Sequence, residues 1–225
     1  MRKSVAFLLL FITGSVVLAA ESPIDRWKRA AGGLDKVAAV KALYREGTIE
    51  YGGAQGTIKV WHTADGRYRK EEAIATYSLT ETFDGTRGSV RQNGAPPREM
   101  TAEELQQVLS RRFSNANAMF FVFFPDRHRG TVSVEDDGTI VFRPEGGIDW
   151  RVTLDAQTSL PKTMVHQEGE RTITVTFDAY ETVDGITLEK ELHRSAGDPA
   201  RGAVIRFTKT VVNPPLDASL FSGQP

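Results

Sequence analysis

The chain has 225 residues, 40% hydrophobic and 25% charged, and its basic and acidic side chains nearly balance, for a formal net charge of -1. These values are typical of a globular protein with a sizeable core and exclude a disordered tail, a collagen or a coiled coil. The lack of a basic excess argues against a nucleic-acid partner. The absence of cysteine excludes disulfides, thiolate metal sites, cysteine nucleophiles and a lipidated cysteine.

The first 20 residues have the pattern of a secretory signal peptide. Arg2 and Lys3 precede an uninterrupted apolar run from Val5 to Ile12, and the segment ends in Ala19-Ala20. An uncleaved membrane anchor is the alternative, but a span needs about 20 apolar residues, and this stretch is shorter and interrupted. We therefore expect cleavage after Ala20, or after Ala19, and an exported mature chain of residues 21–225.

A bacterial lipoprotein needs a cysteine directly after its signal, and this chain has none. If the host is a double-membraned bacterium, the mature protein is expected to be periplasmic, soluble and not lipidated. No long polar linker divides residues 21–225, so we expect a single domain.

Two segments are expected to be helical. Pro23 to Leu43 has apolar residues at mixed helical spacing, and Gly32-Gly33 is expected to divide it into two short helices. Residues 101–113 form a clearer case, because Thr101 followed by Glu104 is a capping box. Leu105, Val108, Leu109 and Phe113 then fall on one apolar face, with Glu103, Gln106, Gln107 and Arg111 on the polar face.

From Gly47 onwards the dominant hydrophobic period is two, which predicts strands with one apolar face. The alternation is clear in residues 148–154 and 173–177. Asp-Gly turns between such runs mark tight hairpins, and they occur at Asp65-Gly66, Asp84-Gly85, Asp137-Gly138 and Asp184-Gly185. The pattern predicts an antiparallel meander of about ten strands, too large for a flat sheet, which should therefore curl.

The segment from Ala118 to Pro125 is apolar on all sides and leaves two interpretations open. It is a plug buried inside the curled sheet, a lid whose surface also faces a cavity for an apolar ligand, or both. An acyl chain of some 16 carbons would gain about 13 kcal/mol from burial in such a cavity, at about 0.8 kcal/mol per methylene.

No catalytic or metal-binding constellation is found in the sequence. The basic clusters Arg67 to Lys70 and Arg127 to Arg129 are expected on solvated strand or loop faces, with contact to anionic lipid head groups as the alternative. We therefore expect a protein that is not an enzyme and needs no metal or cofactor. The four histidines lie far apart, at His62, His128, His166 and His193.

The order of several short motifs resembles the outer-membrane lipoprotein carrier and receptor superfamily (LolA/LolB-like). The motifs are residues 33–40 with 47–49, 56–61 with 66–69, 83–85, 154–155 with 160–161, 176–180 with 183–186, and 213–217 with 220–221. The resemblance implies a β-rich α+β fold in which a strongly curved antiparallel sheet forms an unclosed half-barrel, with a helical lid over an apolar cavity.

The resemblance also implies a function and a site. It implies a soluble, monomeric periplasmic carrier for a lipid or the acyl chain of a lipoprotein, with an inner-membrane transporter or outer-membrane receptor as transfer partner. The alternative is a periplasmic sensor or protein-interaction domain with the same fold that regulates an envelope partner. The family's lid latch is an arginine followed by a proline, and that position here holds His62-Thr63. The expected lining is Tyr68, Leu105, Leu109, Phe113, Met119, Phe120, Phe123, Phe124, Trp150, Val175 and Phe207.

Overall fold

The computed structural model describes residues 20–198 and 201–223. The expected signal peptide lies outside the described residues except for Ala20, so its cleavage stays a prediction. The expectation of a single domain also stays a prediction.

The described strands all belong to one sheet. They are β1 (Ala42–Tyr51), β2 (Ala54–Thr63), β3 (Tyr68–Ile74), β4 (Tyr77–Phe83), β5 (Gly88–Gln92), β6 (Arg98–Glu99), β7 (Gly130–Val134), β8 (Ile140–Pro144), β9 (Trp150–Leu154), β10 (Pro161–Glu168), β11 (Arg171–Val183), β12 (Ile186–Ala196) and β13 (Ala203–Val212). The expected Asp-Gly hairpins are confirmed at the β2–β3, β4–β5, β7–β8 and β11–β12 turns.

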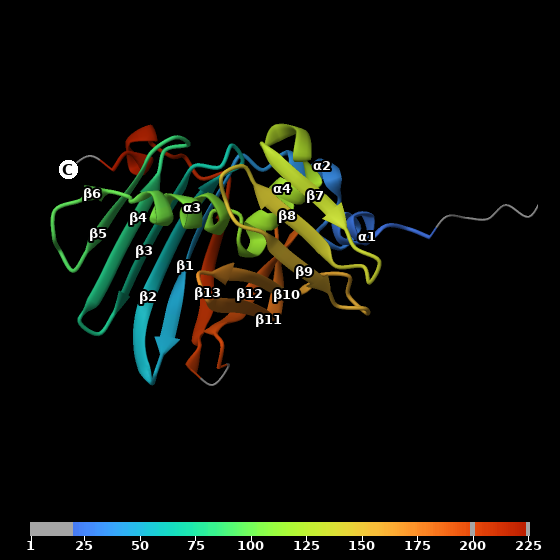
Figure 1. Ribbon diagram of the computed structural model, residues 1–225. Helices are drawn as coiled ribbons and strands as arrows, with labels where there is room; N and C mark the ends of the chain where they lie inside the picture. Colours follow the sequence, from blue (N-terminus) through green and yellow to red (C-terminus); the bar gives the residue numbers. More distant parts are fainter. Residues whose placement is uncertain (1–19, 199–200, 224–225) are drawn as a thin grey trace, which may run out of the picture.

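The sheet has 13 strands in the order β6-β5-β4-β3-β2-β1-β13-β12-β11-β10-β9-β8-β7, and every neighbouring pair is antiparallel. Strands β6 and β7 are its two edges and do not pair with each other, so the strongly curved sheet forms an unclosed half-barrel (Figure 1). The expected fold class is therefore confirmed. The estimate of about ten strands was too low.

The first and last strands of the chain lie side by side at the centre of the sheet. They pair from Leu43 with Val212 to Tyr51 with Ala203, with a register shift between Glu46 and Gly47. A Cβ on Gly47 would lie 1.9 Å from the backbone oxygen of Arg206, so only glycine allows this close approach.

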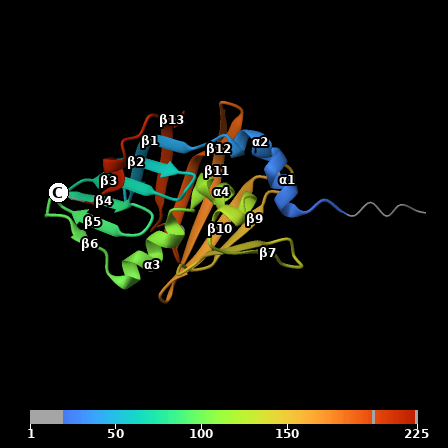
Figure 2. The same cartoon turned by 90° about the horizontal axis from the view of Figure 1, so that it is seen from above.

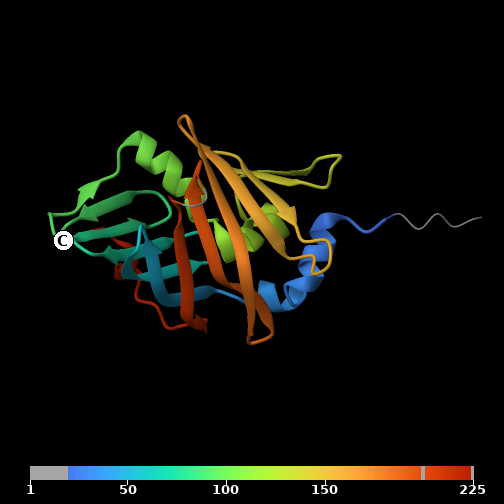
Figure 3. The same cartoon turned by 90° about the horizontal axis from the view of Figure 1, so that it is seen from below.

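The helices are α1 (Pro23–Ala30), α2 (Leu34–Ala38), α3 (Ala102–Arg111) and α4 (Ala118–Phe123), and the short 3₁₀ turns include η1 (Asn115–Asn117), η2 (Pro125–Arg127) and η4 (Ala218–Phe221). Thr101 caps α3 as expected: its backbone N–H donates to the Glu104 carboxylate at 2.8 Å, and the Glu104 N–H donates to its hydroxyl at 3.2 Å. The break between α1 and α2 falls at Gly32-Gly33, as expected. Figure 3 shows α1 and α2 at one end of the half-barrel.

Helix α4 lies inside the curve of the sheet, and α3 crosses the opening between its two halves (Figure 2). All six residues of α4 are buried. Phe121 packs 5.0 Å from Phe113 and 5.4 Å from Phe142, and Phe123 packs edge-on against Trp27 of α1 at 5.0 Å, measured between ring centroids. The structure therefore confirms that this segment is a buried plug, and a contact of its surface with a ligand stays a prediction.

Candidate binding cavity

A cavity of about 90 Å³ lies between the concave face of the sheet and the segment that joins α3 to α4. Alternate residues of neighbouring strands point into it because successive side chains of a strand face opposite sides. Ile49 of β1, Ile58 and Val60 of β2, Leu192 of β12 and Ile205 of β13 form an apolar floor. The other lining residues are Arg45, His62, Tyr68, Lys70, Glu72, Arg111, Ser114, Asn115, Asn117, Trp150, His166, Val175, Glu189, Arg194, Ala203 and Phe207.

Arg45 and Glu189 form an ion pair at this cavity, with side chains only 2% exposed. The Arg45 guanidinium also donates to the Glu189 carbonyl oxygen and lies 3.7 Å from the centre of the Phe207 ring. The aromatic face and the carboxylate together offset the cost of placing this cation inside the protein.

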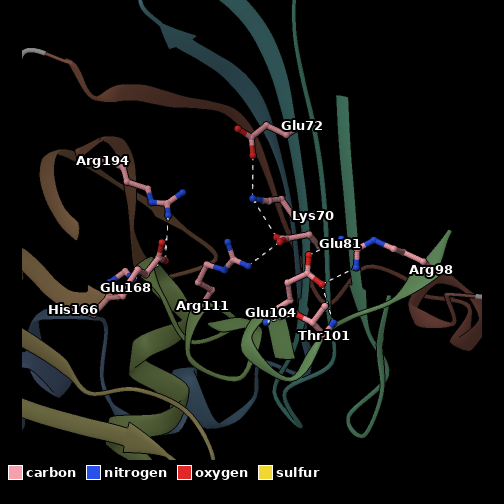
Figure 4. Close-up of polar contacts among 10 residues, drawn as sticks. All are labelled: Lys70, Glu72, Glu81, Arg98, Thr101, Glu104, Arg111, His166, Glu168 and Arg194. Carbon is pink, nitrogen blue, oxygen red and sulfur yellow. Dashed lines mark hydrogen bonds and ion pairs between the residues drawn. The ribbon is translucent and has the colours of Figure 1, made fainter. Parts of the chain in front are cut away.

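A second group of charges joins the sheet to α3 (Figure 4). Lys70 Nζ lies 3.0 Å from a Glu72 oxygen and 3.2 Å from a Glu81 oxygen, and Arg111 Nη2 lies 2.8 Å from the other Glu81 oxygen. Burial alone would raise the pKa of Glu81, but Lys70 and Arg111 outweigh burial and hold it below its usual value. Burial likewise opposes the charge of Lys70, yet Glu81 raises its pKa. Lys70, Glu81 and Arg111 are therefore ionised at neutral pH.

The third group is His166 and Glu168 of β10 with Arg194 of β12, and it is separate from the second group (Figure 4). Glu168 accepts from His166 Nε2 at 2.9 Å and lies 3.5 Å from Arg194. Burial would raise the pKa of Glu168, but the hydrogen bond from His166 and the charge of Arg194 lower it to about 2. Burial lowers the pKa of His166 and outweighs the opposing effect of Glu168, so His166 is neutral at pH 7.

His62, on β2, is the least satisfied polar side chain of the cavity. It is 6% exposed, and neither ring nitrogen has a hydrogen-bond partner among the described residues. Burial, followed by the nearby charge of Arg45, lowers its pKa to about 3. The ring of Tyr68 lies 5.0 Å from the His62 ring, measured between centroids.

The end of α3 is attached to both halves of the sheet by adjacent residues. Arg111 pairs with Glu81 of β4. Ser110 accepts at its hydroxyl from the Ile148 N–H at 2.6 Å, and its carbonyl oxygen accepts from Trp150 Nε1 at 3.1 Å. These contacts place α3 over the opening of the half-barrel.

The structure divides the expected lining residues into two sets. Tyr68, Trp150, Val175 and Phe207 line the cavity, together with the expected latch position His62. The second set lies elsewhere. Leu105 and Leu109 are partly buried on α3, and Phe124 packs against the core with Arg127 over its ring. The residues buried in the core are Phe113, Met119, Phe120 and Phe123. The second set does not line this cavity, and a ligand contact for any of these residues stays a prediction.

The charged lining residues were not anticipated from the sequence. Lys70 was expected on a solvated surface and Arg111 on the polar face of its helix, but both lie at the cavity and pair with Glu81. The expectation for Lys70 was wrong because its side chain is only 9% exposed and finds a buried carboxylate partner. Arg111 reaches the same carboxylate from its helix. One signal was present: Lys70 and Glu72 follow Tyr68 at two-residue spacing and therefore share its face.

Comparison with solved structures identifies the architecture. A LolA superfamily protein from Nitrosomonas europaea matches with a TM-score of 0.55 at 9% identity, over 90% of this chain and 98% of that one. The chain has a LolA-like fold. Two further structures are similar. One is a putative outer membrane lipoprotein-sorting protein domain from Vibrio parahaemolyticus, with a TM-score of 0.48 at 9% identity over 88% of this chain and 97% of that one. The other is a DUF1329 family protein from Desulfovibrio piger, with a TM-score of 0.48 at 14% identity over 90% of this chain and 98% of that one.

No protein-family model and no curated protein matches this sequence. The sequence resemblance to LolA/LolB-like proteins is thus confirmed at the level of the fold. Within residues 20–198 and 201–223 of this LolA-like fold, no helix has the length and apolar character to cross a membrane. The same residues contain no group of three or more His, Cys, Asp or Glu placed to hold a metal ion.

Proposed function

We propose that the protein is a non-enzymatic periplasmic carrier or binding protein for a lipid or for the acyl chain of a lipoprotein. The observation that carries this proposal is the cavity on the concave face of the LolA-like fold, with an apolar floor supplied by four strands. Hydrocarbon needs only such an apolar surface, since each buried methylene contributes about 0.8 kcal/mol.

The cavity of about 90 Å³ is smaller than the roughly 300–1,000 Å³ typical of sites for drug-sized ligands. Entry of an acyl chain therefore requires α3 and η1 to move away from the sheet. The contacts that oppose this movement are the Arg111–Glu81 pair and the hydrogen bonds of Ser110. In this proposal α3 is the lid, and α4 remains part of the core.

The first experiment identifies a bound lipid. The mature protein is purified from a periplasmic extract, its solvent extract is analysed by mass spectrometry, and the delipidated protein is titrated with a fluorescent fatty acid. We expect a co-purifying lipid and saturable binding of the probe. Absence of both results would contradict the proposal.

The second experiment measures the lid directly. Because the chain has no cysteine, spin labels can be placed on Gln106→Cys of α3 and Lys59→Cys of β2, both exposed positions. We expect the distance between these labels to lengthen when the delipidated protein binds lipid. A control pair within the sheet, Lys59→Cys with Asp178→Cys, should not change. An unchanged distance to α3 despite saturating lipid would show that α3 is not the lid.

Location is tested by fractionation of cells that express the full chain. We expect the protein in the periplasmic fraction with its mature N-terminus at Glu21, or at Ala20 if cleavage follows Ala19. Retention in the cytoplasm with Met1 intact would contradict this part of the proposal.

A further inference from the structure

Several polar atoms at the cavity lack a partner although their side chains are more than nine-tenths buried. His62, Asn117 and His166 are 6%, 3% and 2% exposed, and all three line the cavity. Both ring nitrogens of His62, Asn117 Oδ1 and His166 Nδ1 have no hydrogen-bond partner among the described residues. Buried polar groups in folded proteins are nearly always paired, so these atoms leave hydrogen-bonding capacity in the cavity that a polar group could fill.

The unpartnered atoms include both donors and acceptors. His62 is neutral, so one of its nitrogens donates and the other accepts. His166 Nε2 donates to the Glu168 carboxylate, which leaves Nδ1 as an acceptor. Asn117 Nδ2 donates to the Ser114 carbonyl oxygen at 3.4 Å, so its Oδ1 is also an acceptor. Arg111 Nε is a further donor that has no partner in the described part of the chain.

The charges around the cavity cancel. Arg45 pairs with Glu189, and Glu168 lies between His166 and Arg194. Lys70 and Arg111 are balanced by Glu72 and Glu81. A charged head group would have to break one of these pairs or remain uncompensated inside the protein, and both are costly.

We propose that the cavity binds an uncharged hydrogen-bonding group that adjoins hydrocarbon, namely the ester, amide or hydroxyl group of an amphiphile. Such a group supplies a carbonyl or hydroxyl oxygen to the donors His62 and Arg111, and an N–H or O–H to the acceptors. The adjoining hydrocarbon contacts the apolar floor at Ile49, Ile58 and Ile205. The inference rests on the proposed function and specifies the head group of that same ligand.

The test compares amphiphiles that share a 12-carbon chain and differ only in the head group. Delipidated mature protein is titrated below the critical micelle concentration with 1-monolauroylglycerol, N-lauroylethanolamine, laurate and dodecyltrimethylammonium. We expect the two neutral ligands to bind about tenfold or more tightly than the two charged ones, a difference of the size that one or two hydrogen bonds produce. The ester and amide ligands distinguish a glycerolipid from an N-acyl source.

Variants test the residues that carry the preference. His62→Phe keeps an aromatic ring but removes both nitrogens, and it should weaken binding of the neutral ligands about tenfold while leaving laurate unchanged. Asn117→Leu is a second variant, should His62→Phe fail to fold, with the same expectation. His193→Phe, a half-buried histidine of β12 outside the cavity, is the control.

The outcomes separate this inference from the proposed function. Equal affinity for all four ligands, or tighter binding of a charged ligand, overturns the head-group inference and leaves the carrier proposal standing. Unchanged affinities in both His62→Phe and Asn117→Leu also overturn it, because water alone would then satisfy these atoms. Failure of every ligand to bind the wild-type protein contradicts the proposed function itself.

Discussion

Arg111 and Glu81 connect the last turn of α3 to strand β4 across the opening of the half-barrel. Arg111 Nη2 lies 2.8 Å from one carboxylate oxygen of Glu81, and Lys70 Nζ lies 3.2 Å from the other. Glu81 is only 5% exposed. One buried carboxylate therefore balances a cation of the sheet and a cation of the helix that covers the cavity.

Removal of this carboxylate should destabilise the protein strongly. Glu81→Gln keeps the shape of the side chain but leaves Lys70 and Arg111 buried with less compensation. Breaking one partner of a buried ion pair costs about 3–5 kcal/mol. We expect the free energy of unfolding, measured by urea denaturation, to fall by about this amount, and α3 to become more accessible to hydrogen exchange.

The control for this variant is Asp149→Asn, which breaks an ion pair between Arg143 and Asp149 whose side chains are 56% and 46% exposed. Exposed pairs contribute about 0–1 kcal/mol, so this variant should change stability little. Equal losses in the two variants would show that the Glu81 carboxylate has no special role in holding α3.

His62 should make stability depend on pH. Its pKa is about 3 in the folded protein, lowered chiefly by burial, against 6.5 for an unperturbed histidine. Between these values the unfolded chain binds a proton that the folded chain does not, so stability falls as the pH falls from 6.5 towards 3. His128 and His166, whose pKa values burial also lowers, add to the same trend.

His62→Phe removes the proton that position 62 binds in the unfolded chain but not in the folded one. Urea denaturation across pH 4.5–8 should show a slope of stability on pH that is smaller than that of the wild type by up to about 1.4 kcal/mol per pH unit below pH 6.5. Above pH 7 the two slopes should coincide, since His62 is neutral in both states there. Parallel slopes throughout the acid range would mean that folded His62 titrates normally.

Phe121 and Phe124 test whether the apolar segment is a plug. Phe121 is 1% exposed and surrounded by aromatic rings, whereas Phe124 is partly buried at the end of α4. Phe121→Ala should lower the free energy of unfolding by about 3–5 kcal/mol, and Phe124→Ala by clearly less. A larger loss for Phe124→Ala, measured by the same denaturation method, would contradict the packing described for α4.

Local chemistry made much of this fold predictable. The capping box of Thr101 and Glu104 sets the start of α3 within one turn, and the Asp-Gly pairs act within single hairpins. The apolar segment from Ala118 was also expected to be buried or to act as a lid, because no alternating pattern was present. Each of these features depends on residues close together in the sequence.

The charged side of the cavity depends on distant residues and was missed for that reason. Arg111 pairs with a residue 30 positions away, and Arg45 pairs with one 144 positions away. A period-two pattern does not show which polar side chain finds a buried partner. The start of β1 was mispredicted for a similar reason. It was expected at Gly47 but lies at Ala42, because the buried charged residue Arg45 interrupts the apolar alternation.

The corner between α1 and α2 offers a matched pair of glycines. Gly32 and Gly33 both have positive φ angles, +109° and +96°. A Cβ on Gly32 would lie 2.1 Å from the Gly185 backbone oxygen in the β11–β12 turn, whereas a Cβ on Gly33 meets nothing within 4 Å. The Thr187 N–H also donates to the Ala31 carbonyl oxygen at 3.0 Å, which fixes this corner against the hairpin.

Alanine at each position should therefore separate backbone strain from the clash. In both variants the unfavourable φ lowers the free energy of unfolding by roughly 1–2 kcal/mol. Only Gly32→Ala must also displace the β11–β12 turn. We expect Gly33→Ala to be the milder change and Gly32→Ala to lower the free energy of unfolding by at least about 2 kcal/mol more. Equal effects in thermal and urea denaturation would show that the helical corner does not pack against the hairpin as closely as described.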